Sequence, residues 1–418
     1  MQSNAALIST TEGEGVRIGR TSEPGNAGVP FRVTVHDSVE AAEAPWRALE
    51  QDAILTPYQR YDWIKALLDS RPLQGERCAV VVVSDASGPA ALLPLAIARG
   101  PGVKVARIIG ADIGNADWLV MRPQIAPQLT PAVLTGLLAE AARQAGGIDV
   151  IALHSQPERW QGLANPLLGF PHQPAPDHFY FAPVAPVGET GRISSKHLRN
   201  IQRGKRRLGE TMGPVVLRQA DSVEEIARVH AAFIAQRNVR FAAMGVKNVF
   251  AEDWFVAFFR RTAANSLGSD CPALRFHALY AGNEIVATSC GTYCGRHYSQ
   301  YINSTDSGPA AKYSLAGILM HELLAELAET GITSIDMGLG DFGYKDDWTD
   351  MQVVFDGAIA LTTAGRIAAP IILGLRGLKR EIKHNKAVFG MLKRLRALTL
   401  RSKDRGDSGE TPGEGRSE

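Results

Sequence analysis

The sequence predicts a mixed α/β protein made of two consecutive, similar halves. In each half, short β-branched runs separated by glycine turns precede a helical apolar period and a further apolar strand. A length of 418 residues with 45% hydrophobic content is enough for packed cores in both halves. No run reaches the roughly 18 uninterrupted apolar residues expected of a membrane span.

The first half, residues 31–187, is expected to contain a strand, two helices, three further strands, a helix and a final strand. The ranges are strand Phe31–Val35, helices Ser38–Gln51 and Tyr61–Ser70, strands Arg77–Val83, Ala90–Ala98 and Val105–Ile109, helix Thr130–Ala145 and strand Asp149–His154. Three prolines lie in residues 122–131, just before the last helix, and proline removes N–H donors that an anion would need. This half is therefore expected to be structural or to bind the acceptor.

The second half is expected to contain three antiparallel strands, a loop, a helix and two more strands. The ranges are Leu274–Ala281, Glu284–Tyr293 and His297–Asn303, helix Leu315–Thr330, and strands Ile332–Met337 and Val353–Leu361. The loop at 306–313 is rich in small and turn-forming residues, and Ser314 is expected to be the helix N-cap. Free N–H groups and the positive end of the helix dipole would then suit an anion such as a pyrophosphate.

A glycine-spaced segment follows the strand Ile332–Met337. Gly338, Gly340 and Gly343 satisfy the dinucleotide pattern G-x-G-x-x-G, which also requires a helix at the third glycine. A Tyr-Lys-x-x-Trp segment and another β-rich run come instead, so the pattern argues against dinucleotide binding.

Four segments resemble the GNAT N-acyltransferases, in particular their CelD-like branch of cellulose-biosynthesis acetyltransferases. They are Lys196–Leu208, Ala310–Leu319, Ile335–Gly338 and Gly343–Trp348. The resemblance extends over about residues 31–363 and is clearer in the second half. It implies tandem GNAT-like acyltransferase domains that use acetyl-CoA or another acyl-CoA, with the pantetheine arm between the strands His297–Asn303 and Ile332–Met337. The implied pyrophosphate site comprises Ala310, Ala311, Lys312, Tyr313, Ser314 and Gly317, in a looser version of the family's basic-x-x-Gly-x-Gly/Ala loop.

Direct acyl transfer needs a base, a stabilised oxyanion and an acid for the leaving thiolate. Asp336 is expected to be either the general base or the cap of the Gly338 turn. Tyr344 is the candidate acid, and Lys345 a candidate ligand of acceptor or phosphate. Tyr301 is expected to reach the cleft, because Tyr298, three residues earlier on the strand, faces the opposite side.

The expected division of the chain follows from these assignments. It consists of an unstructured segment 1–30, a first GNAT-like domain 31–190, a basic linker or helix 191–213, an acyltransferase domain 214–365, a basic helical tail 366–400 and an unstructured segment 401–418.

Two basic segments have alternative interpretations. Residues 192–207 contain seven Lys/Arg and no acid, and form either a solvated helix face or a contact with an anionic ligand. The tail, residues 366–405, has twelve Lys/Arg against two acids. We expect Ile367, Ile371, Leu375 and Leu378 in the tail to pack on the second domain, the alternative being docking on anionic lipid.

No metal site is expected. Cys290, Cys294 and His297 offer only three ligands and are expected to pack in the core, and the four cysteines are too scattered for a disulfide framework. His321-Glu322 lacks the second histidine of a zincin, because Ala325 stands at that position.

The expected function is therefore acyl-CoA-dependent N- or O-acyl transfer, with acetyl as the expected group, to a cell-envelope or exopolysaccharide sugar or its precursor. Two alternatives remain: a Fem-type peptidyltransferase that uses aminoacyl-tRNA, and a non-catalytic scaffold of polysaccharide-synthesis machinery. The N-terminal segment lacks the pattern of a signal peptide, which predicts a cytoplasmic protein with peripheral membrane contact through its tail as a further option.

Overall fold

A computed structural model describes residues 31–385 except residues 101 and 190. The expected unstructured segments 1–30 and 401–418, and the tail beyond residue 385, lie outside these residues. The helices are α1 (Glu43–Glu50), α2 (Tyr61–Ser70), α3 (Pro131–Gln144), α4 (Ser195–Met212), α5 (Val223–Ala243), α6 (Asp253–Asn265), α7 (Leu315–Glu329) and α8 (Thr363–His384). None of them is long and apolar enough to cross a membrane.

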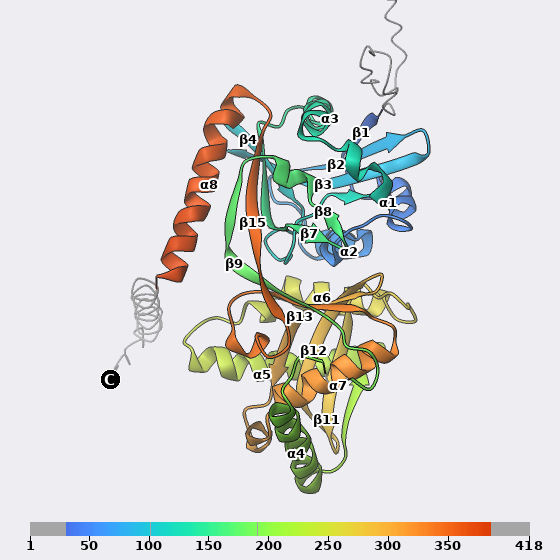
Figure 1. Ribbon diagram of the computed structural model, residues 1–418, viewed down its shortest axis with the longest axis vertical. Helices are drawn as coiled ribbons and strands as arrows, with labels where there is room; N and C mark the ends of the chain where they lie inside the picture. Colours follow the sequence, from blue (N-terminus) through green and yellow to red (C-terminus); the bar gives the residue numbers. More distant parts are fainter. Residues whose placement is uncertain (1–30, 101, 190, 386–418) are drawn as a thin grey trace, which may run out of the picture.

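One continuous mixed sheet runs through both halves of the molecule (Figure 1). Its strands are β1 (Arg32–His36), β2 (Arg77–Asp85), β3 (Gly88–Gly100), β4 (Val103–Ile108), β5 (Val120–Met121), β6 (Val150–Pro157), β9 (His172–Pro183), β10 (Val215–Gln219), β11 (Arg275–Ala281), β12 (Glu284–Cys294), β13 (His297–Thr305), β14 (Ser334–Leu339) and β15 (Asp350–Ala360). Their order is β1-β2-β3-β4-β6-β15-β9-β14-β13-β12-β11-β10, with β5 paired to β3. The short strands β7 (Arg159–Trp160) and β8 (Leu163–Ala164) form a separate pair.

The two halves repeat one topology. Strands β2, β3 and β4 are antiparallel, and β4 then pairs in parallel with β6 after the crossover helix α3. Strands β11, β12 and β13 are likewise antiparallel, and β13 pairs in parallel with β14 after α7. This repetition is the tandem α/β arrangement that the sequence predicts.

The halves are joined by exchanged strands. β15 follows the second half in the sequence but pairs with β6 of the first half on one edge and with β9 on the other. β9 also pairs with β14 of the second half. The division into domains 31–190 and 214–365 stays a prediction, but the sheet is not divided at those positions.

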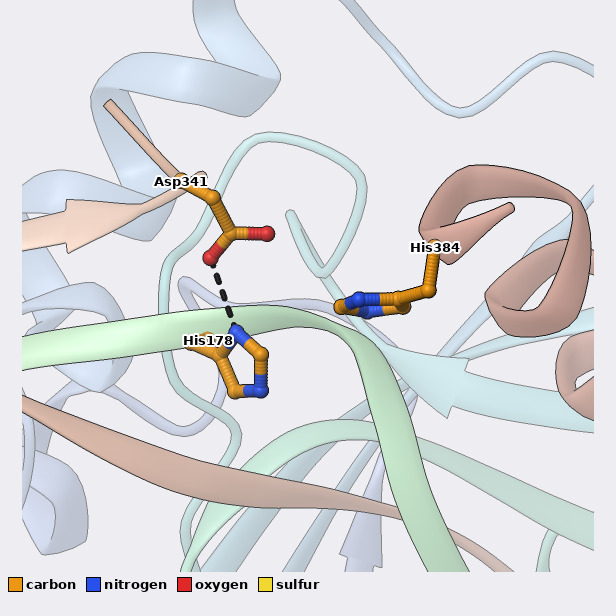
Figure 2. Close-up of side chains that lie close together, drawn as sticks. All are labelled: His178, Asp341 and His384. Carbon is orange, nitrogen blue, oxygen red and sulfur yellow. Dashed lines mark hydrogen bonds and ion pairs between the residues drawn. The ribbon is translucent and has the colours of Figure 1, made fainter. Parts of the chain in front are cut away.

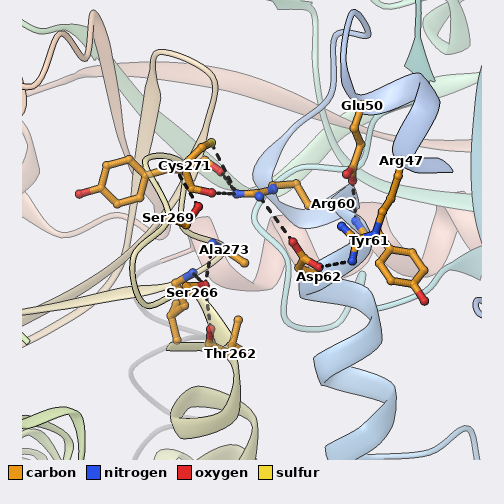
Figure 3. A network of polar contacts seen from close by, with 12 residues as sticks. Arg47, Glu50, Arg60, Tyr61, Asp62, Thr262, Ser266, Ser269, Cys271 and Ala273 are labelled. Carbon is orange, nitrogen blue, oxygen red and sulfur yellow. Dashed lines mark hydrogen bonds and ion pairs between the residues drawn. The ribbon is translucent and has the colours of Figure 1, made fainter. Parts of the chain in front are cut away.

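Side chains also cross between the halves. Arg60, which precedes α2, donates to the backbone oxygens of Cys271 at 3.0 Å and Tyr293 at 2.8 Å (Figure 3). A shared core lies behind this contact, where Trp63 of α2 meets Phe258 of α6 edge to face. Buried apolar contact on this scale favours a fixed arrangement of the two halves.

Helix α8 corrects the prediction for the tail. It packs beside β15, β9, β6 and β4 through a face that includes Gly365 and Ala369, along the flank of the first half (Figure 1). The four residues expected to pack on the second domain, Ile367, Ile371, Leu375 and Leu378, are instead 57–66% exposed. The sequence pattern identifies the apolar face, but the helix turns that face outward.

Candidate functional site

The site lies where β13 and β14 separate. Their parallel ladder has three pairs, from His297 with Ser334 to Ser299 with Asp336. Both strands continue past the last pair, β13 to Thr305 and β14 to Leu339, without further pairing to each other. This divergence is the splayed arrangement that the resemblance implies for the strands that flank a pantetheine arm.

The N-terminus of α7 lies just beyond the end of β13. Ser314 occupies the N-cap position with φ 57° and ψ 47°, a left-handed conformation that is uncommon for a serine, and its side chain makes no cap hydrogen bond. The N–H groups of Leu315, Ala316 and Gly317 belong to the first helical turn, which has no internal acceptors. The position expected for Ser314 is correct, but it does not cap the helix through its hydroxyl.

The loop that leads to α7 is compact. It forms a 3₁₀ turn over Pro309–Tyr313, in which Ala310 is buried. The N–H of Ala311 donates to the oxygen of Gly308 at 3.0 Å, so this donor is occupied within the loop. The ammonium group of Lys312 lies 5.1 Å from the Tyr313 ring centre. Donors to an anion are therefore offered mainly by the helix end.

The basic helix α4 packs against this loop, which answers part of the question left open for residues 192–207. A Cβ on Gly204 would lie 2.7 Å from the Tyr313 oxygen, and one on Gly317 would lie 3.1 Å from Ile201. Thr211 on the same helix is hydrogen-bonded to the Tyr313 hydroxyl at 2.9 Å. Close packing of α4 places exposed Arg203 and Arg207 on the helix that adjoins the proposed anion site.

Asp336 is fully buried in a network of hydrogen bonds. Its Oδ1 accepts from the N–H of Gly338 and from the hydroxyl of Ser299, both at 2.8 Å, and its Oδ2 lies 2.8 Å from His297 Nε2. The other ring nitrogen of His297 lies 2.8 Å from Ser334 Oγ. Every contact holds the carboxylate in place beside the Gly338 turn.

Two residues of the first half close this network from the other side. The hydroxyls of Tyr58 and Ser299 are 2.5 Å apart, and Asn115 Nδ2 donates to the Tyr58 hydroxyl at 2.6 Å. A Cβ at Gly338 would lie 2.5 Å from Asn115 Nδ2, and Gly338 has φ 66°. Glycine is needed at 338 both for its backbone conformation and for the approach of the first half.

Lys345 is buried at the far side of the Gly338 turn. Its ammonium group donates to the oxygen of Leu339 at 2.8 Å and lies 5.0 Å from the Tyr180 ring centre. Burial lowers the pKa of Lys345 to about 8, and Asp336 is the nearest charge that opposes the shift. The structure thus brings Lys345 and Asp336 into one electrostatic environment.

Tyr344 and Tyr301 have different surroundings. Tyr344 is partly exposed, and Asn303 Nδ2 donates to its hydroxyl at 3.4 Å. Tyr301 packs against Trp63 and Phe259, and its hydroxyl donates to the oxygen of Ile113 at 2.7 Å. Burial raises the pKa of Tyr301, so its surroundings are those of a core tyrosine.

A cluster of possible metal ligands includes a residue of the loop that begins at Gly338. His178 of β9, Asp341 of the Gly338–Gly343 loop and His384 at the end of α8 have ligand atoms within 4.8 Å of one another (Figure 2). His178 Nδ1 lies 2.8 Å from Asp341 Oδ1, and the ammonium group of Lys383 lies 3.2 Å from Asp341 Oδ2. Since a lysine already neutralises this carboxylate, we interpret the cluster as an ion-pair network that ties α8 to the loop.

Sequence reasoning missed several members of the site. Tyr58 and Asn115 are far from Asp336 in the sequence, and no local pattern connects them. His297 and Ser299 alternate on one strand face, which is a period-two signal, but the parallel register that joins them to Asp336 has no sequence signature. Cys290 and Cys294 are buried in the core as expected.

Residues 195–346 match the family described as acetyltransferase (GNAT) domain. Among solved structures, the chain is similar to FemX, with 9% identity over 78% of this chain and 96% of that one and a TM-score of 0.53, which shows a shared fold. It also aligns with a conserved protein of unknown function from Bacteroides thetaiotaomicron VPI-5482 (12% identity, 80% and 100% coverage, TM-score 0.49). A third alignment is to a tandem GNAT protein from the clavulanic acid biosynthesis pathway (11% identity, 79% and 99% coverage, TM-score 0.39). No curated protein matches the chain.

Proposed function

We propose, on the premise that the GNAT domain over residues 195–346 makes this protein an acyltransferase, that it transfers an acetyl group directly from acetyl-CoA to a sugar of the cell envelope or of an exopolysaccharide, or to its precursor. Domains of this family use an acyl-CoA as co-substrate. The acceptor and the CelD-like branch rest on the resemblance of the sequence segments alone.

The open N-terminus of α7 is the observation that carries the proposal. Its first-turn N–H groups have no side-chain cap, and α7 packs against β13. A pyrophosphate at this end would meet N–H donors, the positive helix dipole and the cations of α4. A pantetheine arm that continues from it would run between the diverging strands toward the Gly338 turn.

The chemistry requires a proton acceptor near that turn. The acceptor's amine or hydroxyl loses its proton as it attacks the thioester carbon, the carbonyl oxygen becomes anionic, and the C–S bond then breaks to release the thiolate. With a pKa of about 8, Lys345 is partly neutral at mildly alkaline pH, and the neutral amine can accept a proton. Tyr344, whose hydroxyl accepts from Asn303 of β13, is the proposed acid for the thiolate.

Asp336 retains both proposed roles, base and turn cap. Its three hydrogen-bond partners occupy both carboxylate oxygens and favour the structural role, because a general base must contact the proton that it removes. The proposal for Tyr301 as a catalytic group has no comparable support, since its hydroxyl is bonded to Ile113 in the core.

Arg237 on α5 supports an anionic acceptor. Its guanidinium lies over the rings of Phe233, Phe241 and Phe250, its buried Nε has no hydrogen-bond partner among the described residues, and burial lowers its pKa to about 10. The Tyr344 hydroxyl is near enough to affect that pKa. A buried guanidinium needs an anionic partner, and a carboxylate or phosphate on the acceptor would supply one.

Calorimetric titration with acetyl-CoA tests the donor, and a screen of amino sugars and sugar phosphates for CoA release tests the acceptor. Binding of acetyl-CoA at micromolar affinity would support the proposal. Absence of CoA binding together with salt-sensitive tRNA binding would instead support the Fem-type alternative, with α4 as the RNA contact. If the protein binds neither ligand, the remaining alternative is the non-catalytic scaffold.

A further inference from the structure

The face of α8 that lies on the protein carries three cations beside the small and aliphatic residues Gly365, Ala369, Ile372 and Leu373. Arg376 forms a bidentate pair with the buried Asp356 at 2.5 and 3.0 Å, and Arg380 donates to the oxygen of Ala175 at 2.7 Å. Lys383 bridges Asp177 and Asp341. These contacts come from β15, β9 and the loop after β14, and they fix the rotation of the helix about its axis.

The opposite face is apolar and exposed. We call it the α8 stripe, and it consists of Ile367, Ile371, Leu375 and Leu378, each 57–66% exposed. Their spacing of four, four and three residues puts them on one side of the helix. A surface helix normally turns its large aliphatic side chains toward the core and leaves polar residues in water. The contacts of the inward cations therefore hold an apolar surface toward an external partner.

Charge decides between the possible partners. Exposed Arg366 and Lys379 lie on α8 beside the stripe, with Glu381 as the one acid of the helix. The chain that follows, residues 386–405, contains seven Lys/Arg and only Asp404 as an acid. A second copy of this chain would bring two such basic segments together, which is unfavourable. An anionic lipid surface attracts them and also accepts aliphatic side chains without a matched pocket.

We propose that the α8 stripe inserts at the interface of an anionic membrane, with Arg366 and Lys379 beside it at the phosphate level. The inference goes beyond the acyl transfer proposed above and holds whichever acyl donor the site uses. It also gives a reason why the cations of α8 face the protein. If they faced outward, they would turn the α8 stripe away from the membrane.

Vesicle flotation of the full-length protein tests the proposal. We expect binding to phosphatidylcholine vesicles that contain phosphatidylglycerol, little binding to phosphatidylcholine alone, and loss of binding at about 1 M salt, where the screening length falls to about 3 Å. The double variant I371E/L375E should lower the partition coefficient by at least about tenfold, because two aliphatic side chains no longer enter the interface. Its melting temperature should stay that of the wild type, since both side chains are exposed.

The matched control is V223E/V239E, which places the same two charges at exposed valines of α5. This variant should bind vesicles as the wild type does. Equal binding by I371E/L375E and the wild type would overturn the proposal, as would no binding of the wild type to anionic vesicles. Self-association that I371E/L375E abolishes would identify a second copy as the partner. A gain of binding to neutral vesicles after deletion of residues 386–418 would show that the chain covers its own stripe. Acetyl-CoA titration of the same samples reports on the proposed function separately.

Discussion

The loops that enter α3 and α7 occupy the same position in the two halves but differ in their donors. The first carries Pro123, Pro127 and Pro131, and its N-cap, Thr130, accepts from the N–H of Val133. The second enters its helix through Ser314, which has positive φ and no side-chain cap. One helix end is therefore satisfied internally, whereas the other keeps donors available for a ligand.

The parallel strand pairs, β4 with β6 and β13 with β14, also differ between the halves in the side chains that they carry. Val105 pairs with Val150 and Arg107 with Ala152 in the first half, where the second half pairs His297 with Ser334 and Ser299 with Asp336. The polar network at the parallel pairs of the second half therefore has no counterpart at the Val105–Val150 pair of the first half. The comparison teaches that repetition of topology does not carry the site with it, because the site depends on a few side chains at the parallel pairs and the helix entry.

Replacement of Asp336 by Asn should have the largest effect on stability. The amide keeps the shape but cannot accept from both His297 and Ser299 as the carboxylate does, so we expect a loss of about 2–3 kcal/mol in the free energy of unfolding. Urea denaturation measures the loss. Turnover per folded molecule should stay normal. A large fall in turnover with unchanged stability and CoA affinity would instead identify Asp336 as the base.

Ser314→Glu tests the open helix end. A carboxylate at the N-cap of α7 would repel the pyrophosphate and occupy its donors, so acetyl-CoA affinity should fall by at least about tenfold in calorimetric titration. Thr130→Glu, the same change at the N-cap of α3, should leave the affinity unchanged. If both variants bind CoA alike, the two helix ends do not differ in function.

Lys345→Met should remove one contribution to the pH dependence of stability, that of the buried lysine of the second half. The folded pKa of Lys345 is about 8, below its ordinary value of 10.5, so between these values the unfolded chain holds more protons than the folded protein. The stability contributed by this group therefore rises with pH over that window. The difference in unfolding free energy between wild type and K345M should increase from pH 8 to pH 10. A constant difference would contradict the lowered pKa.

The smallest effects come from removing the two hydroxyls. Thr130→Ala should lower the free energy of unfolding by about 1 kcal/mol, because it removes a helix cap. Ser314→Ala should change it by less than about 0.5 kcal/mol, because no cap is lost. Chemical denaturation of both variants under one condition makes the comparison, and equal losses would mean that Ser314 caps its helix after all.

Local patterns were sufficient for residues 274–361 of the second half, whereas β10, α5 and α6 were not predicted. The glycine turns at Gly282 and Gly295 mark the meander, and α2 and the start of α7 have the predicted bounds. β9 was missed, because Pro174 and Pro176 argue against a strand, although β9 is central in the sheet. α1 begins later than predicted, because residues before Glu43 form turns.

The sequence predicted only those parts of the site that lie within one continuous segment. The loop and helix end at Ala310–Gly317 follow from composition and helix periodicity, and the resemblance supplied their role. The surroundings of Asp336 did not follow, since they depend on Tyr58 and Asn115 from the other half. The outward direction of the α8 stripe also depends on tertiary partners, namely Asp356 and Asp177, which attract its cations.

The position of β9 has a consequence for synthesis of the chain. Both of its partners, β14 and β15, come later in the sequence, beginning at Ser334 and Asp350. At about 5–20 residues per second, β9 leaves the ribosome roughly ten seconds or more before either partner is made. During that interval β6 and β9 present unpaired edges that other chains can join. The sheet can therefore be completed only after β15 has been made.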